Sequence, residues 1–205
     1  MNEILVEKFV YRITMKKVGA AKFISHLDLL DILKSAIGCA GLPVYYSKGF
    51  NPTMKMSYPY PLPVGVSGQN EVFDLYLNKK IPAASIARNL NKYLMDGIHI
   101  IEVGRIEKRR PIKGGQNVKT SLIMTLLRLN DDEKMPDYTL CPISEILNGD
   151  NVDDIDVKYI MSGMVRISFK LCIDSKLKPQ KFLSGLAVLD DRTYRVAAVT
   201  RVSLS

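Results

Sequence analysis

The sequence predicts an α+β protein with two domains, and three observations lead to this prediction. The chain has 205 residues, which is enough for one or two domains. Its first half reads as strand, helix, strand, strand or hairpin, helix, strand, the split βαβ arrangement of a ferredoxin-like domain with an antiparallel sheet. A basic, glycine-containing stretch around 107–116 then separates the halves. We therefore expect a ferredoxin-like basic domain over residues 1–113 and a second, smaller α+β domain over 116–205.

The first strand and the first helix have clear signals. Residues 6–16 mix Val, Tyr, Ile and Thr with basic residues, a composition typical of a strand. From Ser25 to Ala40 apolar residues recur at spacings of three and four, which indicates a helix, and Gly41 and Pro43 end it. Ser25 and Asp28 have the spacing of a capping box, so we assign both a structural role at the helix start.

The remaining elements follow in order along the chain. In the first half we expect a short strand over 42–47, a turn over 49–52, a proline-rich extended segment over 54–66, a strand over 69–77, a helix from Pro82 to about Met95 and a strand over 98–106. In the second half we expect strands over 118–129, 157–162, 164–173 and 194–204, and short helices over 143–147 and 179–186. This pattern is that of a second α+β domain.

Several classes of protein are excluded by composition. No window approaches the roughly 20 apolar residues of a membrane helix, and charged residues occupy the first positions, so we expect a cytoplasmic protein without a membrane partner. Cys39, Cys141 and Cys172 are too far apart for a C-x-x-C site, and the chain has only two histidines. We expect no metal and no cofactor.

The net charge of +8 lies entirely in the first half. Residues 1–115 hold 17 Lys and Arg against 9 Asp and Glu, whereas residues 116–205 hold 12 of each. This asymmetry predicts that a polyanion, most simply RNA, contacts the first domain. Ordinary solubility charge is the alternative.

Three groups of residues supply the candidate binding site. His26 lies in the first turn of the first helix, where the helix N-terminus disfavours the imidazolium form. A turn with two lysines, aromatic rings and exposed amides can hold phosphate and stack a base, and it contains Lys48, Phe50, Asn51 and Lys55, with Gly49 and Pro52 as structural residues. The densest basic run contains Arg105, Lys108, Arg109, Arg110 and Lys113.

Each group also has a purely structural interpretation. His26 can be a buried histidine with a backbone partner. The turn can be structural, with a positive φ at Gly49 and Phe50 packed on the core. The basic run can be a solvated linker.

Four segments in fixed order resemble a known family. They are Phe23-Ile24-Ser25-His26-Leu27-Asp28-Leu29-Leu30, Ala40-Gly41-Leu42-Pro43-Val44, Tyr46-Ser47-Lys48-Gly49-Phe50-Asn51-Pro52 and Pro61-Leu62-Pro63-Val64-Gly65-Val66-Ser67. This set resembles the radical SAM-linked protein family of uncharacterised bacterial domains, over about residues 11–106. The chain departs from the family at Asp31, at Gly38-Cys39 and at Thr53. The resemblance implies a stand-alone accessory form with a radical SAM protein, encoded nearby, as partner.

Three hypotheses about function follow. In the first, the protein is a non-catalytic accessory whose first domain binds tRNA or rRNA and whose second domain docks the radical SAM protein. In the second, it is a metal-independent endoribonuclease with a ferredoxin-like fold, in which His26 is the catalytic acid or base and Lys48 stabilises phosphate charge. In the third, it is a pure protein-interaction module whose basic half meets an acidic partner.

Overall fold

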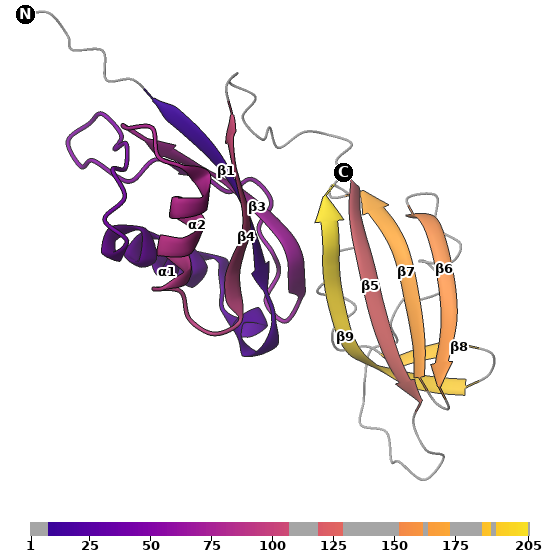
Figure 1. The fold of residues 1–205 in the computed structure, drawn as a ribbon. Helices are drawn as coiled ribbons and strands as arrows, with labels where there is room; N and C mark the ends of the chain where they lie inside the picture. Colours follow the sequence, from indigo (N-terminus) through magenta and orange to yellow (C-terminus); the bar gives the residue numbers. More distant parts are fainter. Residues whose placement is uncertain are drawn as a thin grey trace, which may run out of the picture. The chain divides into compact units, whose positions relative to one another are not determined.

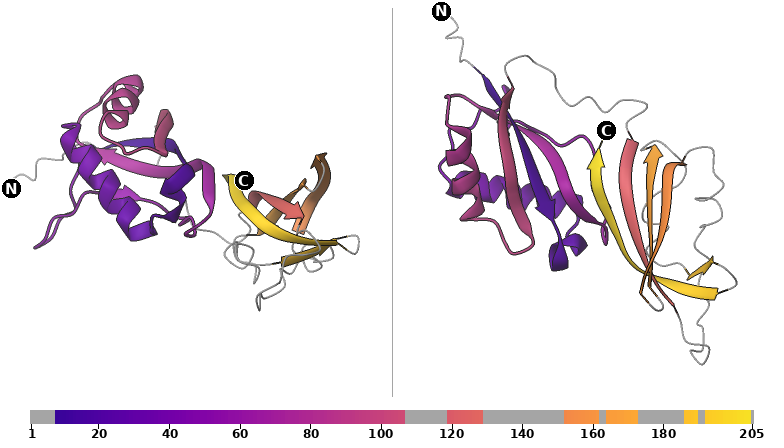
Figure 2. Two further views of the ribbon diagram at one scale, coloured as in Figure 1. Left: turned by 90° about the horizontal axis from the view of Figure 1, so that it is seen from below. Right: turned by 45° about the vertical axis from the view of Figure 1, so that its right-hand side comes forward.

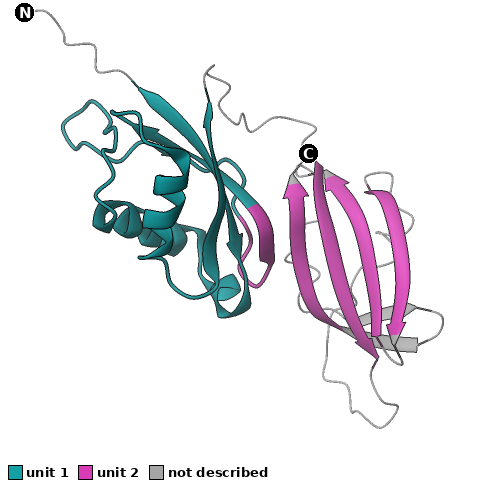
Figure 3. Ribbon diagram, viewed as in Figure 1, with its two compact units in different colours: residues 1–61, 71–114 teal, residues 62–70, 115–205 magenta. Residues whose placement is uncertain are grey.

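The computed structural model describes residues 8–106, 119–128, 152–161, 164–172, 186–189 and 192–204. The chain divides into two compact units, coloured separately in Figure 3. Unit 1 contains residues 1–61 and 71–114, and unit 2 contains residues 62–70 and 115–205. The short segment 62–70 therefore belongs to unit 2, although the chain on both sides of it belongs to unit 1.

Unit 1 combines strands with two α-helices (Figure 1). Its elements are β1 (Phe9–Lys17), the 3-10 helix η1 (Gly19–Phe23), α1 (His26–Cys39), β2 (Met56–Ser57), most of β3 (Ser67–Leu77), α2 (Ala83–Asn91) and β4 (Ile98–Ile106). The strands lie in the order β4-β1-β3, and β2 pairs with β3. β1 and β4 are antiparallel, with a register shift between Thr14 and Met15.

Alternation along the strands gives this sheet an apolar face. The buried apolar residues of the strands are Tyr11, Ile13, Met15, Phe73, Leu75, Leu77, Ile98 and Ile100. They form one core with Leu29, Leu33 and Ile37 of α1 and with Ile86 and Leu90 of α2. Both helices therefore cover the same face, as the right-hand view of Figure 2 shows. Because strand side chains alternate, residues such as Arg12, Lys16 and Tyr76 project from the opposite side, here called the outer face.

Unit 2 consists of strands in the part of the chain that the structure describes. They are β5 (Lys119–Arg128), β6 (Val152–Met161), β7 (Met164–Cys172), β8 (Leu186–Leu189) and β9 (Arg192–Leu204). The antiparallel order is β9-β5-β7-β6, and β8 also pairs with β9. Ser67 and Gly68, at the start of β3, pair in parallel with Thr200 and Arg201. Leu62 and Val66 lie in the same core as Met124 and Ile167.

The predicted fold class is wrong. The described residues contain nine strands, with both antiparallel and parallel pairings, and only two α-helices, which is not a ferredoxin-like α+β fold. β2 has only two residues, since the segment after it is interrupted by Pro59, Pro61 and Pro63. β3 begins with a parallel pairing to β9, so the predicted purely antiparallel sheet is also wrong.

The positions of individual strands and helices agree better with the sequence predictions than the fold class does. β4 has the predicted bounds, and the strands expected in the second half are present as β5, β6, β7 and β9. The strand expected over 42–47 is reduced to isolated bridges at Val44 and Tyr46, and α2 ends at Asn91. The predicted helix over 143–147, and all of the one over 179–186 except Leu186, lie outside the described residues. In the described ranges, no helix is long and apolar enough to cross a membrane.

Candidate functional site

The first turn of α1 is fixed by the predicted cap. Ser25 is the N-cap residue, and its Oγ accepts a hydrogen bond from the Asp28 backbone N–H at 3.2 Å. The same hydroxyl donates to Asp28 Oδ2 at 2.6 Å. These bonds satisfy helix donors that would otherwise have no intrahelical partner. They also hold the next residue, His26, at the helix start.

His26 lies in a cluster of aromatic and ionisable side chains. Its ring centroid is 5.1 Å from that of Tyr58, and Tyr58 in turn stacks on Phe73 at 6.3 Å. The Tyr58 hydroxyl donates a hydrogen bond to Oε2 of Glu71 at 3.0 Å. His26 Nδ1 is buried and has no hydrogen-bond partner among the described residues. The structural interpretation, a histidine with a backbone partner, therefore does not hold for this nitrogen.

A buried lysine adds charge to this cluster. Lys17 has no exposed surface, and its ammonium donates to the carbonyl of Ile24. Burial, and secondly the charge of Lys17, lower the pKa of His26. The sequence predicts a neutral imidazole from its place at the helix N-terminus, and desolvation and the charge of Lys17 favour the same neutral form. A neutral His26 can hydrogen-bond or exchange a proton, but it supplies no positive charge for a phosphate.

The predicted turn forms the tip of a hairpin. Tyr46 and Met54 pair across it, the Ser47 N–H donates to the Thr53 carbonyl at 2.8 Å, and the Thr53 N–H donates to Ser47 Oγ at 3.0 Å. The five residues from Lys48 to Pro52 are all exposed.

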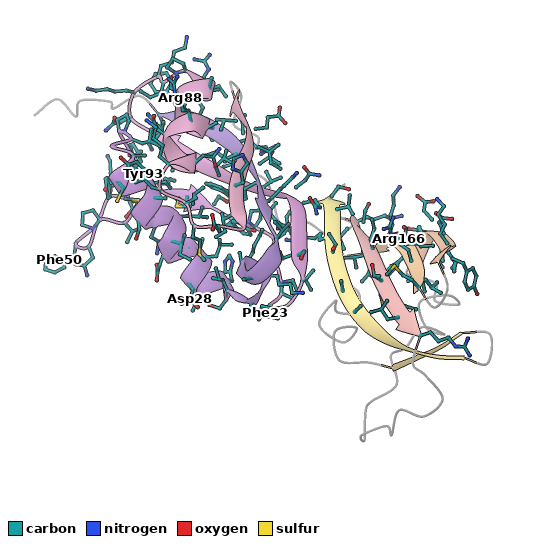
Figure 4. The ribbon with its side chains drawn as sticks, turned by 60° about the horizontal axis from the view of Figure 1, so that its bottom comes forward. Phe23, Asp28, Phe50, Arg88, Tyr93 and Arg166 are labelled. Carbon is teal, nitrogen blue, oxygen red and sulfur yellow. The ribbon has the colours of Figure 1, made fainter. Side chains whose placement is uncertain are left out.

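Phe50 is the outermost residue of this tip. Its relative exposure is 101%, and Figure 4 shows its ring at the end of the loop, directed away from the helices. The interpretation in which Phe50 packs on the core is therefore wrong. Gly49 beside it has a φ of 153°, a value that side-chain-bearing residues rarely adopt.

The base of the same hairpin carries a second set of aromatic and basic residues on the outer face. Lys55 Nζ lies 5.3 Å from the centre of the Tyr76 ring, and Lys8 Nζ lies 4.4 Å from the centre of the Tyr45 ring. We call these four residues the lysine–tyrosine face. Both contacts lie within the range of cation–π interactions. Of the four, only Lys55 was predicted from the sequence.

An ion pair borders the lysine–tyrosine face. Arg12 donates from Nε and Nη2 to the two carboxylate oxygens of Asp74, at 3.0 and 3.2 Å. The Asp74 side chain is fully buried, whereas that of Arg12 is 38% exposed. Further along β1, the exposed Lys16 pairs in register with the exposed His99 of β4. On this part of the outer face Arg12 and Lys16 are cationic, whereas the exposed Glu102, in register with Thr14, is acidic.

Only one residue of the predicted basic run, Arg105, lies in the part of the chain that the structure describes. Arg105 is exposed near the end of β4, whereas Lys108, Arg109, Arg110 and Lys113 lie outside the described residues. The structure therefore brings Lys48, Phe50, Asn51 and Lys55 together in one hairpin. It places His26 in the separate cluster at the start of α1.

A shallow hollow lies on the helical side of unit 1. It has a volume of about 500 Å³ and is lined by Asp28, Asp31, Ile32, Ser35, Tyr93 and Met95. Two of the lining residues are carboxylates, and Lys34 pairs with Asp31 at 2.8 Å. The carboxylates make this hollow unsuitable for a polyanion. In the described ranges no group of three or more His, Cys, Asp or Glu residues has the arrangement of a metal site.

These features define a β-rich protein of two compact units whose first unit carries an aromatic and cationic surface. A family model described as an uncharacterized protein conserved in bacteria (DUF2344) matches residues 10–133. The match covers more than half of the chain, and the protein belongs to this family. No curated protein matches the chain.

Proposed function

We propose that this protein is a cytoplasmic, non-catalytic accessory of a radical SAM enzyme and that its first unit binds RNA, either tRNA or rRNA. The observation that carries the RNA-binding part is Phe50, which is fully exposed at the hairpin tip beside Lys48 and Asn51. An exposed phenylalanine contributes nothing to the core. It is available to stack on an unpaired base while a neighbouring lysine contacts phosphate.

Charge supports the same assignment. The whole net charge of +8 lies in residues 1–115, which include all of unit 1. Lysines and arginines that neutralise phosphates release counterions, so such binding weakens steeply as salt increases.

The accessory role rests on the resemblance to the radical SAM-linked family. The three cysteines at 39, 141 and 172 do not form a C-x-x-x-C-x-x-C triplet, so this chain does not supply the cysteines of a radical SAM cluster. The enzyme would be a separate protein, and the second domain is the part of this chain that we expect to dock it.

Fluorescence anisotropy with labelled tRNA tests RNA binding. We expect affinity to fall by at least about tenfold between about 50 and about 200 mM salt. Phe50→Ala should weaken binding by about tenfold, the loss of one stacked base. Tyr93→Ala is the matched control, since Tyr93 is also an exposed aromatic residue but borders the acidic hollow. Undetectable binding at low salt would refute the RNA-binding function. Co-purification with the radical SAM protein that survives nuclease treatment would then favour a pure protein-interaction module.

One observation favours a catalytic alternative, a metal-independent endoribonuclease. His26 combines a buried Nδ1 that lacks a partner among the described residues with a lowered pKa, which suits a general acid or base. Incubation of RNA with wild type and with His26→Ala distinguishes the two functions. Cleavage by wild type alone would establish catalysis, whereas no cleavage, or equal cleavage, would reject it.

A further inference from the structure

We infer that the lysine–tyrosine face binds unpaired bases, so that the RNA bound by this protein is single-stranded where it meets unit 1. This inference rests on the proposed RNA-binding function and names the substrate class and a second contact surface. It depends on Lys8, Tyr45, Lys55 and Tyr76, which lie apart from the exposed tip of the hairpin.

Backbone hydrogen bonds place the two tyrosines and Lys55 side by side. The Tyr45 N–H donates to the Tyr76 carbonyl at 2.8 Å, the Lys55 N–H donates to the Tyr45 carbonyl at 2.9 Å, and the Tyr76 N–H donates to the Lys55 carbonyl at 3.2 Å. Cross-strand neighbours of this kind have Cβ atoms about 5 Å apart. The three side chains thus form one continuous patch.

The pattern of burial shows which way this patch faces. The neighbouring residues Val44, Met56, Leu75 and Leu77 belong to the core beneath the helices. Because side chains alternate along an extended chain, Tyr45, Lys55 and Tyr76 project to the opposite side. All three are only partly buried, although each flanks a core residue. The two tyrosine rings therefore remain partly accessible on the outer face.

The chemistry of the patch fits a single strand better than a duplex. An aromatic ring can stack on any base, but only on one that is not already stacked within a helix. Lysines held over the rings, at 4.4 and 5.3 Å, place positive charge next to the stacking surfaces, where the phosphates of a bound strand would pass. Arg12 adds a partly exposed guanidinium whose partner Asp74 is buried. An acidic protein surface would use these cations but not the partly exposed tyrosine rings.

The test compares three labelled probes on the full-length protein: a uridine oligonucleotide of about 12 residues, its abasic counterpart and an RNA duplex of the same length. We expect the oligonucleotide to bind at least about tenfold more tightly than the abasic strand, because the two carry the same phosphates and differ only in their bases. Equal affinity for these two strands, or tighter binding of the duplex, would overturn the inference.

Variants then locate the stacking surface. Tyr45→Leu combined with Tyr76→Leu should weaken oligonucleotide binding by at least about tenfold and leave duplex binding unchanged. Tyr93→Leu is the control and should bind as wild type does. If the double tyrosine variant does not fold, Lys8→Gln with Lys55→Gln replaces it, and we expect the salt slope of binding to fall by about two. An unchanged affinity and slope would overturn the inference.

The Phe50→Ala variant separates this inference from the proposed function. If RNA binds and only Phe50→Ala weakens it, the function stands and the stacking surface on the outer face does not exist. If wild type binds none of the three probes and no tRNA, both proposals fail. If wild type fails to bind RNA but binds polyglutamate, the partner is an acidic protein.

Discussion

The hydroxyl of Tyr58 donates a hydrogen bond to the carboxylate of Glu71, and Glu71 is almost completely buried, with 1% of its surface exposed. A buried carboxylate is costly unless it is paired and hydrogen-bonded. The bond also joins the proline-rich segment before β3 to β3 itself.

The Tyr58–Glu71 bond should contribute measurably to stability. Tyr58→Phe keeps the ring that stacks on Phe73 and removes only the hydroxyl. We expect the free energy of unfolding to fall by about 1 to 3 kcal/mol, because a buried acceptor loses a donor. Urea denaturation measures this change. Tyr93→Phe removes an exposed hydroxyl and should leave stability unchanged; equal effects of the two variants would contradict the prediction.

Arg12 should be more important for stability than its exposure suggests. Arg12→Met leaves the fully buried carboxylate of Asp74 without its bidentate partner. We expect a loss of about 3 kcal/mol in the free energy of unfolding. Lys34→Met breaks the exposed pair with Asp31 and should cost less than about 1 kcal/mol. Similar midpoints of urea unfolding for the two variants would disprove the difference.

The lowered pKa of His26 predicts a dependence of stability on pH. In the unfolded chain the imidazole titrates near about 6.5, whereas burial and then Lys17 lower its pKa in the native protein. Between these two values the unfolded chain binds a proton that the native protein does not. The free energy of unfolding therefore decreases as the pH falls through this window.

Replacement of His26 should flatten this dependence. His26→Gln should lose less stability than wild type when urea unfolding is compared at about pH 7 and about pH 5. His99→Gln changes the exposed histidine of β4 and serves as the control. Parallel pH profiles for His26→Gln and wild type would show that His26 does not cause the dependence.

Gly97 should not tolerate a side chain. Its φ is 86°, and an added Cβ would lie 2.4 Å from the Val18 carbonyl oxygen and 2.9 Å from Ala21 Cβ. Gly41 has a similar φ of 61° but open space around it. We expect Gly41→Ala to cost about 1 kcal/mol from backbone strain alone and Gly97→Ala to cost clearly more. Thermal unfolding of the two variants measures this difference. Equal melting temperatures would contradict the predicted clash between a Cβ at position 97 and the Val18 carbonyl oxygen.

Local signals predicted much of unit 1. The start of α1 follows from Ser25 and Asp28, which act within one helical turn. The fold class could not be predicted in the same way, because the pairing of Ser67 with Thr200 joins residues far apart in the sequence. No local pattern in 62–70 indicates that Leu62 and Val66 pack in the core of unit 2.

The candidate sites differ in how far their residues can be predicted from the sequence. The hairpin tip was recognisable from its turn residues and lysines. The sequence analysis did not identify Lys17 and Glu71 as buried, although the alternation of side chains along a strand could have done so. Lys17 lies two residues after the core residue Met15, and Glu71 lies two residues before the core residue Phe73, so both project to the core side. The lysine–tyrosine face was missed because Tyr45 and Tyr76 meet only through cross-strand pairing.

The membership of segment 62–70 in unit 2 has a consequence for fragments of this protein. Leu62 and Val66 are buried with β5 and β7, yet they precede the whole second half of the chain. On the ribosome this segment emerges before its partners exist, so the core of unit 2 is completed only when β9 has been synthesised. If the folded protein is cleaved after Gly114, segment 62–70 stays covalently attached to fragment 1–114, whereas its side chains Leu62 and Val66 pack in the core formed by fragment 115–205. The two fragments should therefore stay associated without a covalent link and elute together in size-exclusion chromatography.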